Sequence, residues 1–405
     1  MITQGMSILS RGESLISGFD KKASVLDYDI PCSPPTRWPP SQPLKMSWLT
    51  RTHGPWPVSV YSTGPKLVST VRLRRGKATT YARRGSKGAV RMELPRSSAG
   101  VVRHPVEVES DGVSLRGWLF EPTSRSEQIP AVAMIHGFSA TIDGMVADRY
   151  AAAFAQTGVA ALLVDTRGFG RSDGDPRRQI NPWAEARDYI ACIDHLTSTD
   201  GIDTEAIAVW GDSLSGRVAA VVAAVDRRVA AVIVQVPTFG DELEPPDIDG
   251  SRFDTIRGIV LDNTFSSYGS QVLGPMPVVS SDQLSTPSFL TPITAFHWFI
   301  TYGARFGTGW QNQATQQVID TPITFSPQPC IPHIDVPFLL VVAEEDEMPW
   351  CDAAIARQVH ASTSGPQEVV EIGGGHFGLL YHDSEYFTSS VDAQRSFLTS
   401  HLLRA

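Results

Sequence analysis

The six residues Gly211-Asp-Ser-Leu-Ser-Gly216 decide how this sequence folds. They lie between an apolar run, Ala206–Trp210, and a longer apolar stretch with helical spacing, Leu214–Val225. A serine at a tight turn from strand to helix projects out of the sheet, and its neighbours must be small because the backbone is crowded there. The neighbours here are a glycine and Ser215, which stands where the G-x-S-x-G pattern has its second glycine. A helix start capped by Ser213 is the other interpretation of these residues.

Buried strands and amphipathic helices alternate along the chain on both sides of this turn. The predicted strands are Pro130–Ile135, Val159–Val164, Ala206–Trp210, Val229–Val236, Phe338–Ala343 and Glu368–Ile372, and the predicted helices are Asp143–Thr157, Trp183–Leu196, Leu214–Val225, Cys351–Ser362 and Thr388–Leu403. A hairpin, Val106–Glu109 with Val113–Phe120, precedes them. The alternation is typical of a parallel sheet with helices on both faces. We therefore expect an α/β fold whose mostly parallel sheet has eight strands, with a large insertion after the sixth.

Two titratable side chains follow later strands of this predicted sheet. Asp346 comes soon after Phe338–Ala343, and His376 stands in a glycine-rich segment after Glu368–Ile372. Open α/β sheets build their sites at these carboxyl ends of strands. A histidine with a reference pKa of about 6.5 accepts a proton from a serine and returns it to a leaving group, while an acid fixes the histidine tautomer. Ser213, Asp346 and His376 are therefore the candidate catalytic residues.

Other acids and histidines compete for these two roles. The competing side chains are Glu344, Glu345, Glu347, His195, His333 and His382. Asp346 is preferred because its shorter side chain loses less rotamer freedom than that of a glutamate. His376 is preferred because a histidine between glycines projects from its loop and approaches another backbone closely.

The chain order of Ser213, Asp346 and His376 resembles that of the α/β-hydrolase superfamily rather than that of the two serine-protease orders. The resemblance implies an oxyanion hole with two backbone donors. These would be the N–H of Phe138, in the His136-Gly-Phe138 segment after a strand, and the N–H of Leu214. His136 itself is expected to hold that loop rather than to react.

The resemblance extends beyond the superfamily, over about Val106 to Leu403. The segment Asp165–Gly174 resembles a loop common in these enzymes, in which we expect Asp165 and Arg167 to form a structural pair. The serine turn, together with Asp226–Pro237, resembles a branch that contains polyketide transferases and Xaa-Pro dipeptidyl-peptidase-like hydrolases. This branch implies esterase, thioesterase or acyl-transfer chemistry with no metal and no organic cofactor.

Four segments divide the chain. We expect a disordered basic extension at 1–103, a first part of the hydrolase core at 104–236, a helical cap or lid at 237–332, and the rest of the core at 333–405. The cap segment is rich in aromatic residues, namely Phe239, Phe253, Phe265, Tyr268, Phe289, Phe296, Trp298, Phe299, Tyr302, Phe306 and Trp310. Each of them alone is better explained by packing. Together they favour a mainly apolar pocket and an apolar acyl substrate.

Charge separates the extension from the rest of the chain. Residues 1–100 hold 16 basic and 5 acidic residues, whereas the other 305 hold 18 and 38. The basic segment lacks periodicity, and an over-long start is one explanation for it, with Met46 and Met92 as alternative first residues. The acidic remainder argues against a nucleic-acid surface.

No apolar run reaches the length of a membrane span and no signal peptide is evident. Four scattered cysteines favour reduced thiols in the cytoplasm.

Three functions remain open on the sequence alone. The first is a serine hydrolase or acyltransferase that acts on an ester or thioester through an acyl-enzyme on Ser213. The second is an amidase or aminopeptidase, in which Asp241, Glu242 or Glu244 near the cap would bind a substrate amine. The third is a catalytically silent protein that binds a small molecule in the same pocket. Neither the acyl group, nor its acceptor, nor the oligomeric state follows from the sequence.

Overall fold

The computed structural model describes residues 70–73, 77–80, 97–98, 100–124 and 127–403. The predicted disorder of the basic extension therefore falls mostly outside the described residues. Within it, β1 (Thr70–Leu73) and β2 (Lys77–Thr80) pair as an antiparallel two-stranded sheet. No helix in the described part of the chain is long and apolar enough to cross a bilayer.

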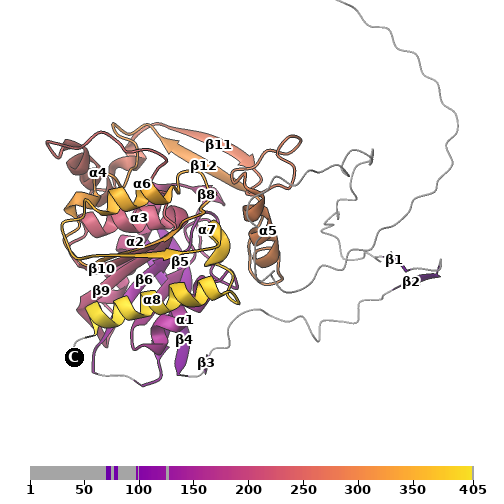
Figure 1. Cartoon of the computed structure of the whole chain (residues 1–405), viewed down its shortest axis with the longest axis horizontal. Coiled ribbons are helices and arrows are strands. Elements are labelled where there is room, and N and C mark those ends of the chain that lie inside the picture. The colour runs from indigo at the N-terminus through magenta and orange to yellow at the C-terminus, as the bar shows by residue number, and fades with distance from the viewer. Residues whose placement is uncertain (1–69, 74–76, 81–96, 99, 125–126, 404–405) are drawn as a thin grey trace, which may run out of the picture. The chain divides into compact units, whose positions relative to one another are not determined.

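One nine-stranded sheet forms the core (Figure 1). Its strands, in spatial order, are β14 (Gln367–Ile372), β13 (Phe338–Ala343), β10 (Val229–Gln235), β9 (Ile202–Asp212), β6 (Ile129–Ile135), β7 (Ala160–Val164), β5 (Val113–Pro122), β4 (Val101–Ser110) and β3 (Ser97–Ser98). The six strands from β14 to β7 run parallel, β5 pairs antiparallel with β7, and β4 pairs antiparallel with β5. The predicted fold class is confirmed, with the two-residue β3 as one additional strand.

Helices cover both faces of this sheet. Figure 1 shows α2 (Pro182–Thr197), α3 (Ser213–Val225) and α6 (Ala353–His360) on one side, and α1 (Ala147–Gln156) and α8 (Glu385–Leu402) on the other. Along β6, residues 131, 133 and 135 pack toward the first set of helices, and residues 132 and 134 toward the second. Every β6 side chain is buried, so the strand has no polar alternation.

The first helix begins later than its sequence predicts. The expected start was Asp143, but Gly144 and Val146 have φ angles of 76° and 83°, which no right-handed helix accommodates. The chain therefore enters α1 only at Ala147. At the other end of the domain, Ser384 caps α8 by accepting a hydrogen bond from the Phe387 N–H at 3.0 Å, so this helix starts before the predicted Thr388.

The segment between β10 and β13 mixes helices and strands. It contains α4 (Ser251–Leu261), β11 (Ser270–Met276), α5 (Ile293–Tyr302), β12 (Ala314–Ile319) and two short 3-10 helices. The strands β11 and β12 form a small sheet with β8 (Gln179–Ile180). The sequence predicts a helical cap and does not reveal this small sheet. The reason is that β11 is almost wholly exposed, so its sequence lacks the alternation of buried and exposed residues that marks a strand.

Candidate active site

Ser213 occupies the sharp turn between β9 and α3. Its φ is 53°, in the left-handed region that a residue with a side chain rarely adopts, and its side chain is half-buried. A Cβ atom on Gly211 would lie 2.3 Å from the Ser215 carbonyl oxygen, so only glycine fits there. Ser215 is fully buried, and its hydroxyl donates to the His136 carbonyl at 3.0 Å. The serine in place of the second glycine thus ties the turn to the neighbouring loop.

His136 and Asp212 form a buried pair next to this turn. His136 Nδ1 lies 2.9 Å from Asp212 Oδ1, and His136 Nε2 donates to the Met145 carbonyl at 2.6 Å. The Gly137 N–H donates to the same aspartate oxygen at 2.8 Å. Burial lowers the pKa of His136, but the charge and hydrogen bond of Asp212 outweigh it, so the pKa is raised overall. Both ring nitrogens are engaged, which agrees with the expectation that His136 holds the loop.

The loop and the turn present two backbone N–H groups. The Phe138 N–H, which follows Gly137, has no hydrogen-bond partner among the described residues. The Leu214 N–H belongs to the first turn of α3, where no carbonyl of the same helix reaches it. The two amides named as oxyanion donors from the sequence therefore come from adjacent strand ends, β6 and β9, which pair in the sheet.

His376 and Asp346 form the second buried pair. His376 Nδ1 lies 2.8 Å from Asp346 Oδ2, and both side chains are only 2% exposed. His376 sits in α7 (Gly375–Gly378), a single turn entered through Gly374 with a left-handed φ of 88°. Burial lowers the pKa of His376, but the Asp346 carboxylate outweighs it and raises this pKa well above its usual value. The structure thus brings together the acid and the histidine named from the sequence.

The acids beside Asp346 have other partners. Glu344 pairs with Arg357, and Glu345 is exposed. Glu347 Oε2 accepts a hydrogen bond from the His376 backbone N–H at 3.0 Å, while its other oxygen binds the Thr294 hydroxyl at the start of α5. The Met348 N–H donates to Asp346 Oδ1 at 2.9 Å and fixes that carboxylate.

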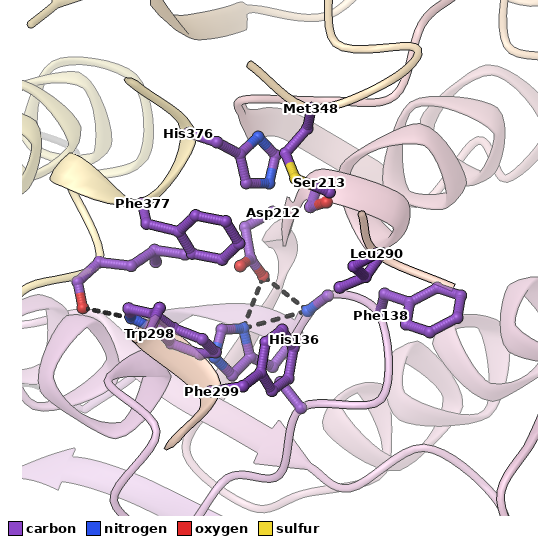
Figure 2. Close-up of a pocket in the computed structure, with 13 residues that line it drawn as sticks. His136, Phe138, Asp212, Ser213, Leu290, Trp298, Phe299, Met348, His376 and Phe377 are labelled. Carbon is purple, nitrogen blue, oxygen red and sulfur yellow. Dashed lines mark hydrogen bonds and ion pairs between the residues drawn. The ribbon is translucent and has the colours of Figure 1, made fainter. Parts of the chain in front are cut away.

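Ser213 and His376 border one small cavity (Figure 2). Its walls are mostly apolar and include Phe138, Ala140, Leu290, Trp298, Phe299, Met348, Phe377 and Leu380. Leu290, Trp298 and Phe299 come from the segment between β10 and β13. Trp298 stacks on Phe377, and its Nε1 donates to the Leu380 carbonyl at 2.9 Å. That segment therefore contacts the residues that follow His376.

Other expectations about individual residues have mixed outcomes. Arg167 does not pair with Asp165: its Nε donates to Asp188 of α2 at 3.0 Å, because that buried carboxylate faces the loop. Asp165 instead accepts from the Ile142 and Arg171 backbone N–H groups. Of the eleven cap aromatics, only Trp298 and Phe299 line the cavity.

Cys351 is a neighbour of the histidine that sequence spacing did not reveal. The ligand atoms of Asp346, Cys351 and His376 all lie within 4.8 Å of one another, the one group of three metal-ligating side chains found in the described part of the chain. Thiolate, imidazole and carboxylate are zinc ligands. A metal held there would bind the imidazole of His376, the same side chain that the sequence predicts as the candidate base.

Sequence comparisons place these residues among known proteins. A family model described as X-Pro dipeptidyl-peptidase (S15 family) matches residues 111–242, which include Ser213 but neither Asp346 nor His376. Thiohydrolase aneE of Aspergillus aculeatus is 37% identical over 139 residues, which are 33% of this chain and 42% of that protein. Polyketide transferase ATR5 of Stachybotrys chlorohalonatus is 39% identical over 148 residues, which are 36% of this chain and 48% of that protein. The chain thus spans less than half the length of either relative.

A solved structure covers more of the chain. The crystal structure of the α/β hydrolase GrgF from Penicillium sp. sh18 is 26% identical with a TM-score of 0.54, over 74% of this chain and 99% of that one. The predicted resemblance to the polyketide-transferase and dipeptidyl-peptidase-like branch is confirmed by these matches.

Proposed function

Because the chain belongs to the α/β-hydrolase superfamily, we propose that it is a serine hydrolase or acyltransferase that cleaves an ester or thioester of an apolar acyl group. One observation carries the proposal. Ser213, held at a left-handed φ between β9 and α3, borders the same cavity as His376, whose Nδ1 is bound to Asp346 at 2.8 Å. The thiohydrolase and polyketide transferase relatives support acyl-transfer chemistry.

In this mechanism each residue has one task. Asp346 accepts a hydrogen bond from the Nδ1–H of His376, so Nε2 is the nitrogen that accepts the Ser213 proton as the hydroxyl attacks the acyl carbon. The Phe138 and Leu214 N–H groups stabilise the oxyanion of the tetrahedral intermediate. His376 then protonates the leaving alcohol or thiol, which leaves an acyl-enzyme on Ser213. Water or an alcohol attacks this ester in the second half of the reaction, with His376 again as the base.

The walls of the cavity support an apolar acyl group. Trp298 and Phe299 of α5, with Phe377 and Leu380 from the segment around His376, form part of the apolar lining. Residues 237–332 are accordingly proposed as a cap, which supplies apolar contacts and excludes water. The buried thiols of Cys192, Cys330 and Cys351 are free, which supports the proposed cytoplasmic location.

An amidase or aminopeptidase is the second candidate, and the dipeptidyl-peptidase family match favours it. Such an enzyme needs a carboxylate for the substrate amine. Asp241 accepts from the Trp350 N–H at 2.6 Å, and Glu244 pairs with Arg252 and Ser326. Neither these acids nor Glu242 line the cavity at Ser213. These contacts favour ester or thioester substrates over short peptides.

A fluorophosphonate probe with a substrate panel tests the proposal. We expect the probe to label Ser213 and the Ser213→Ala variant to stay unlabelled, with turnover lower by several orders of magnitude and a melting curve like the wild type. Acyl thioesters and p-nitrophenyl esters should react faster than aminoacyl anilides. A folded wild type without labelling would identify a silent binder, and preference for anilides would identify a peptidase.

A further inference from the structure

A third buried side chain lies beside the His376–Asp346 pair. Cys351 is 4% exposed, and its Sγ, one carboxylate oxygen of Asp346 and one imidazole nitrogen of His376 all lie within 4.8 Å of one another. A thiol, a carboxylate and an imidazole thus gather in one place. The mechanism proposed above uses the carboxylate and the imidazole and gives the thiol no task.

Backbone hydrogen bonds fix the loop that carries two of these three side chains. The Met348 N–H donates to Asp346 Oδ1 at 2.9 Å, and the Cys351 N–H donates to the Met348 carbonyl at 3.2 Å. The Gly240 N–H donates to the Trp350 carbonyl at 2.9 Å, which ties this loop to the segment after β10. None of these bonds uses the Cys351 thiol or Asp346 Oδ2. Both ligand atoms are therefore held in place by contacts that metal binding does not disturb.

Zinc matches this set of ligands in chemistry and in size. Thiolate sulfur, imidazole nitrogen and carboxylate oxygen bind Zn²⁺ at about 2.0–2.3 Å. A tetrahedral zinc holds its ligand atoms about 3–4 Å apart, so side-chain shifts of about 1 Å suffice to close the cluster around an ion. A thiolate also favours zinc over magnesium and calcium, which prefer oxygen ligands.

Charge balance favours a divalent ion at this buried position. The Asp346 and His376 side chains are each 2% exposed, and a charge removed from water to this extent needs a partner. The Asp346 carboxylate and a Cys351 thiolate carry two negative charges, while the neutral imidazole carries none. One Zn²⁺ therefore makes the cluster neutral. The thiol proton leaves for solvent when the zinc–sulfur bond forms.

An ion has a short way into the cluster. Trp350, directly before Cys351, is 54% exposed, and its φ is 67°. His376 borders the cavity that Ser213 faces. The cluster thus lies next to the surface on one side and next to this cavity on the other, which supplies the entry path that a metal site needs.

We propose that Asp346, Cys351 and His376 form an inhibitory zinc site, in which the ion switches off the enzyme by occupying its base. A neutral imidazole has one nitrogen without a proton. When the ion binds that nitrogen, the other nitrogen carries the ring proton, so neither can accept the proton of Ser213. The inhibition rests on the proposed function, whereas the binding of the ion does not.

A zinc titration of the full chain tests the inhibition. Zn²⁺ added to chelator-treated wild type should abolish both ester turnover and fluorophosphonate labelling of Ser213, and EDTA should restore both. Mg²⁺ and Ca²⁺ at the same concentrations should have no effect. Loss of a second-shell partner costs about 10–100-fold in metal affinity. Loss of a ligand in Cys351→Ser should therefore raise the half-inhibiting zinc concentration by roughly 100-fold or more, measured against that variant's own zinc-free rate.

Cys330→Ser is the matched control for the loss of a buried thiol. The Cys330 thiol donates to the Ser326 carbonyl at 3.6 Å, and a hydroxyl can donate to the same oxygen. This variant should keep the zinc sensitivity of the wild type. Cys351→Ala repeats the test without a hydroxyl beside His376 and should be as insensitive as Cys351→Ser. Wild-type zinc sensitivity in both Cys351 variants would overturn the proposal.

Cobalt binding separates this inference from the proposed function. Co²⁺ takes the ligands of a zinc site, and a cobalt–thiolate bond absorbs in the near ultraviolet whether or not the protein turns over a substrate. The wild type and Cys330→Ser should show this band, and Cys351→Ser should lose it. A Cys351-dependent band in a protein without Ser213-dependent turnover would support the metal site and contradict the proposed function alone. Ser213-dependent turnover without a Cys351-dependent band would overturn the metal site alone.

Discussion

Two buried histidine–aspartate pairs border the cavity that Ser213 faces, and they differ in what their second ring nitrogen does. His136–Asp212 and His376–Asp346 have distances of 2.9 and 2.8 Å, and all four side chains are 2% exposed. In the first pair the Met145 carbonyl takes the second nitrogen. In the second pair the hydrogen bonds to Asp346 all involve Nδ1, no described carbonyl or carboxylate accepts from Nε2, and the imidazole lies beside the Cys351 thiol and borders the cavity. Equal burial and equal pairing thus produce a structural histidine in one place and a candidate base in the other.

Replacing each histidine should separate the two pairs most strongly. His376→Ala should lower kcat by about 10⁴-fold or more, because the members of a triad act as one unit. Each change also leaves a buried carboxylate without its histidine, Asp346 in one variant and Asp212 in the other, which costs about 3–5 kcal/mol of unfolding free energy in either case. Steady-state rates on folded protein therefore decide between the pairs, with urea denaturation to show that each variant is folded. An active His376→Ala beside a folded but inactive His136→Ala would reverse the assignment.

Changing the acid of the second pair should have the next largest effect. Asp346→Asn keeps the shape but favours the wrong histidine tautomer, and we expect kcat to fall by roughly 10⁴-fold. Glu345→Gln is the control, since Glu345 is exposed and adjacent in sequence. Steady-state rates on one activated ester compare them. A large loss of kcat in Glu345→Gln, with kcat nearly unchanged in Asp346→Asn, would identify Glu345 and not Asp346 as the acid that orients His376.

The pH dependence of kcat/KM should show how the Asp346 carboxylate acts on the pKa of His376. The raised pKa of His376 places the acidic limb of kcat/KM above the value of about 6.5 for a free histidine. Activity requires the neutral imidazole, so it should rise as pH increases through that limb. In the residual activity of Asp346→Asn the limb should lie at lower pH, because burial then acts on His376 without the carboxylate. If the acidic limb has the same midpoint pH in the wild type and in Asp346→Asn, the ionisation of His376 does not determine it.

The sequence predicted the parts of this molecule that depend on local pattern. Apolar runs such as Phe338–Ala343 and the small residues around Ser213 indicated the sheet, its helices and the turn. Contacts between distant segments were not predictable in the same way. The partner of Arg167 is Asp188 because of how α2 packs, and Cys351 reaches His376 only through the fold of the loop after β13. The distinction between the two histidine pairs depends on one carbonyl, that of Met145, which no motif marks.

The smallest expected effect concerns Glu347, which supports the second pair from outside. Its carboxylate accepts from the His376 backbone N–H at 3.0 Å and also binds Thr294, so it links α7 to the start of α5. A hydrogen bond of this kind contributes about 0.5–1.5 kcal/mol, and a barrier change of that size alters a rate by roughly two- to tenfold. Glu347→Ala should therefore lower kcat within that range.

The same change should leave KM nearly constant, because Glu347 acts on the orientation of the base and does not line the cavity. Glu347→Gln keeps an oxygen that accepts from the His376 N–H, so it should recover most of the activity. Glu345→Ala removes a neighbouring acid that is exposed, and it controls for the lost charge. Measured kcat and KM for the three variants decide the matter. Equal kcat values in Glu347→Ala and Glu345→Ala would mean that the backbone of α7 holds His376 in place without help from α5.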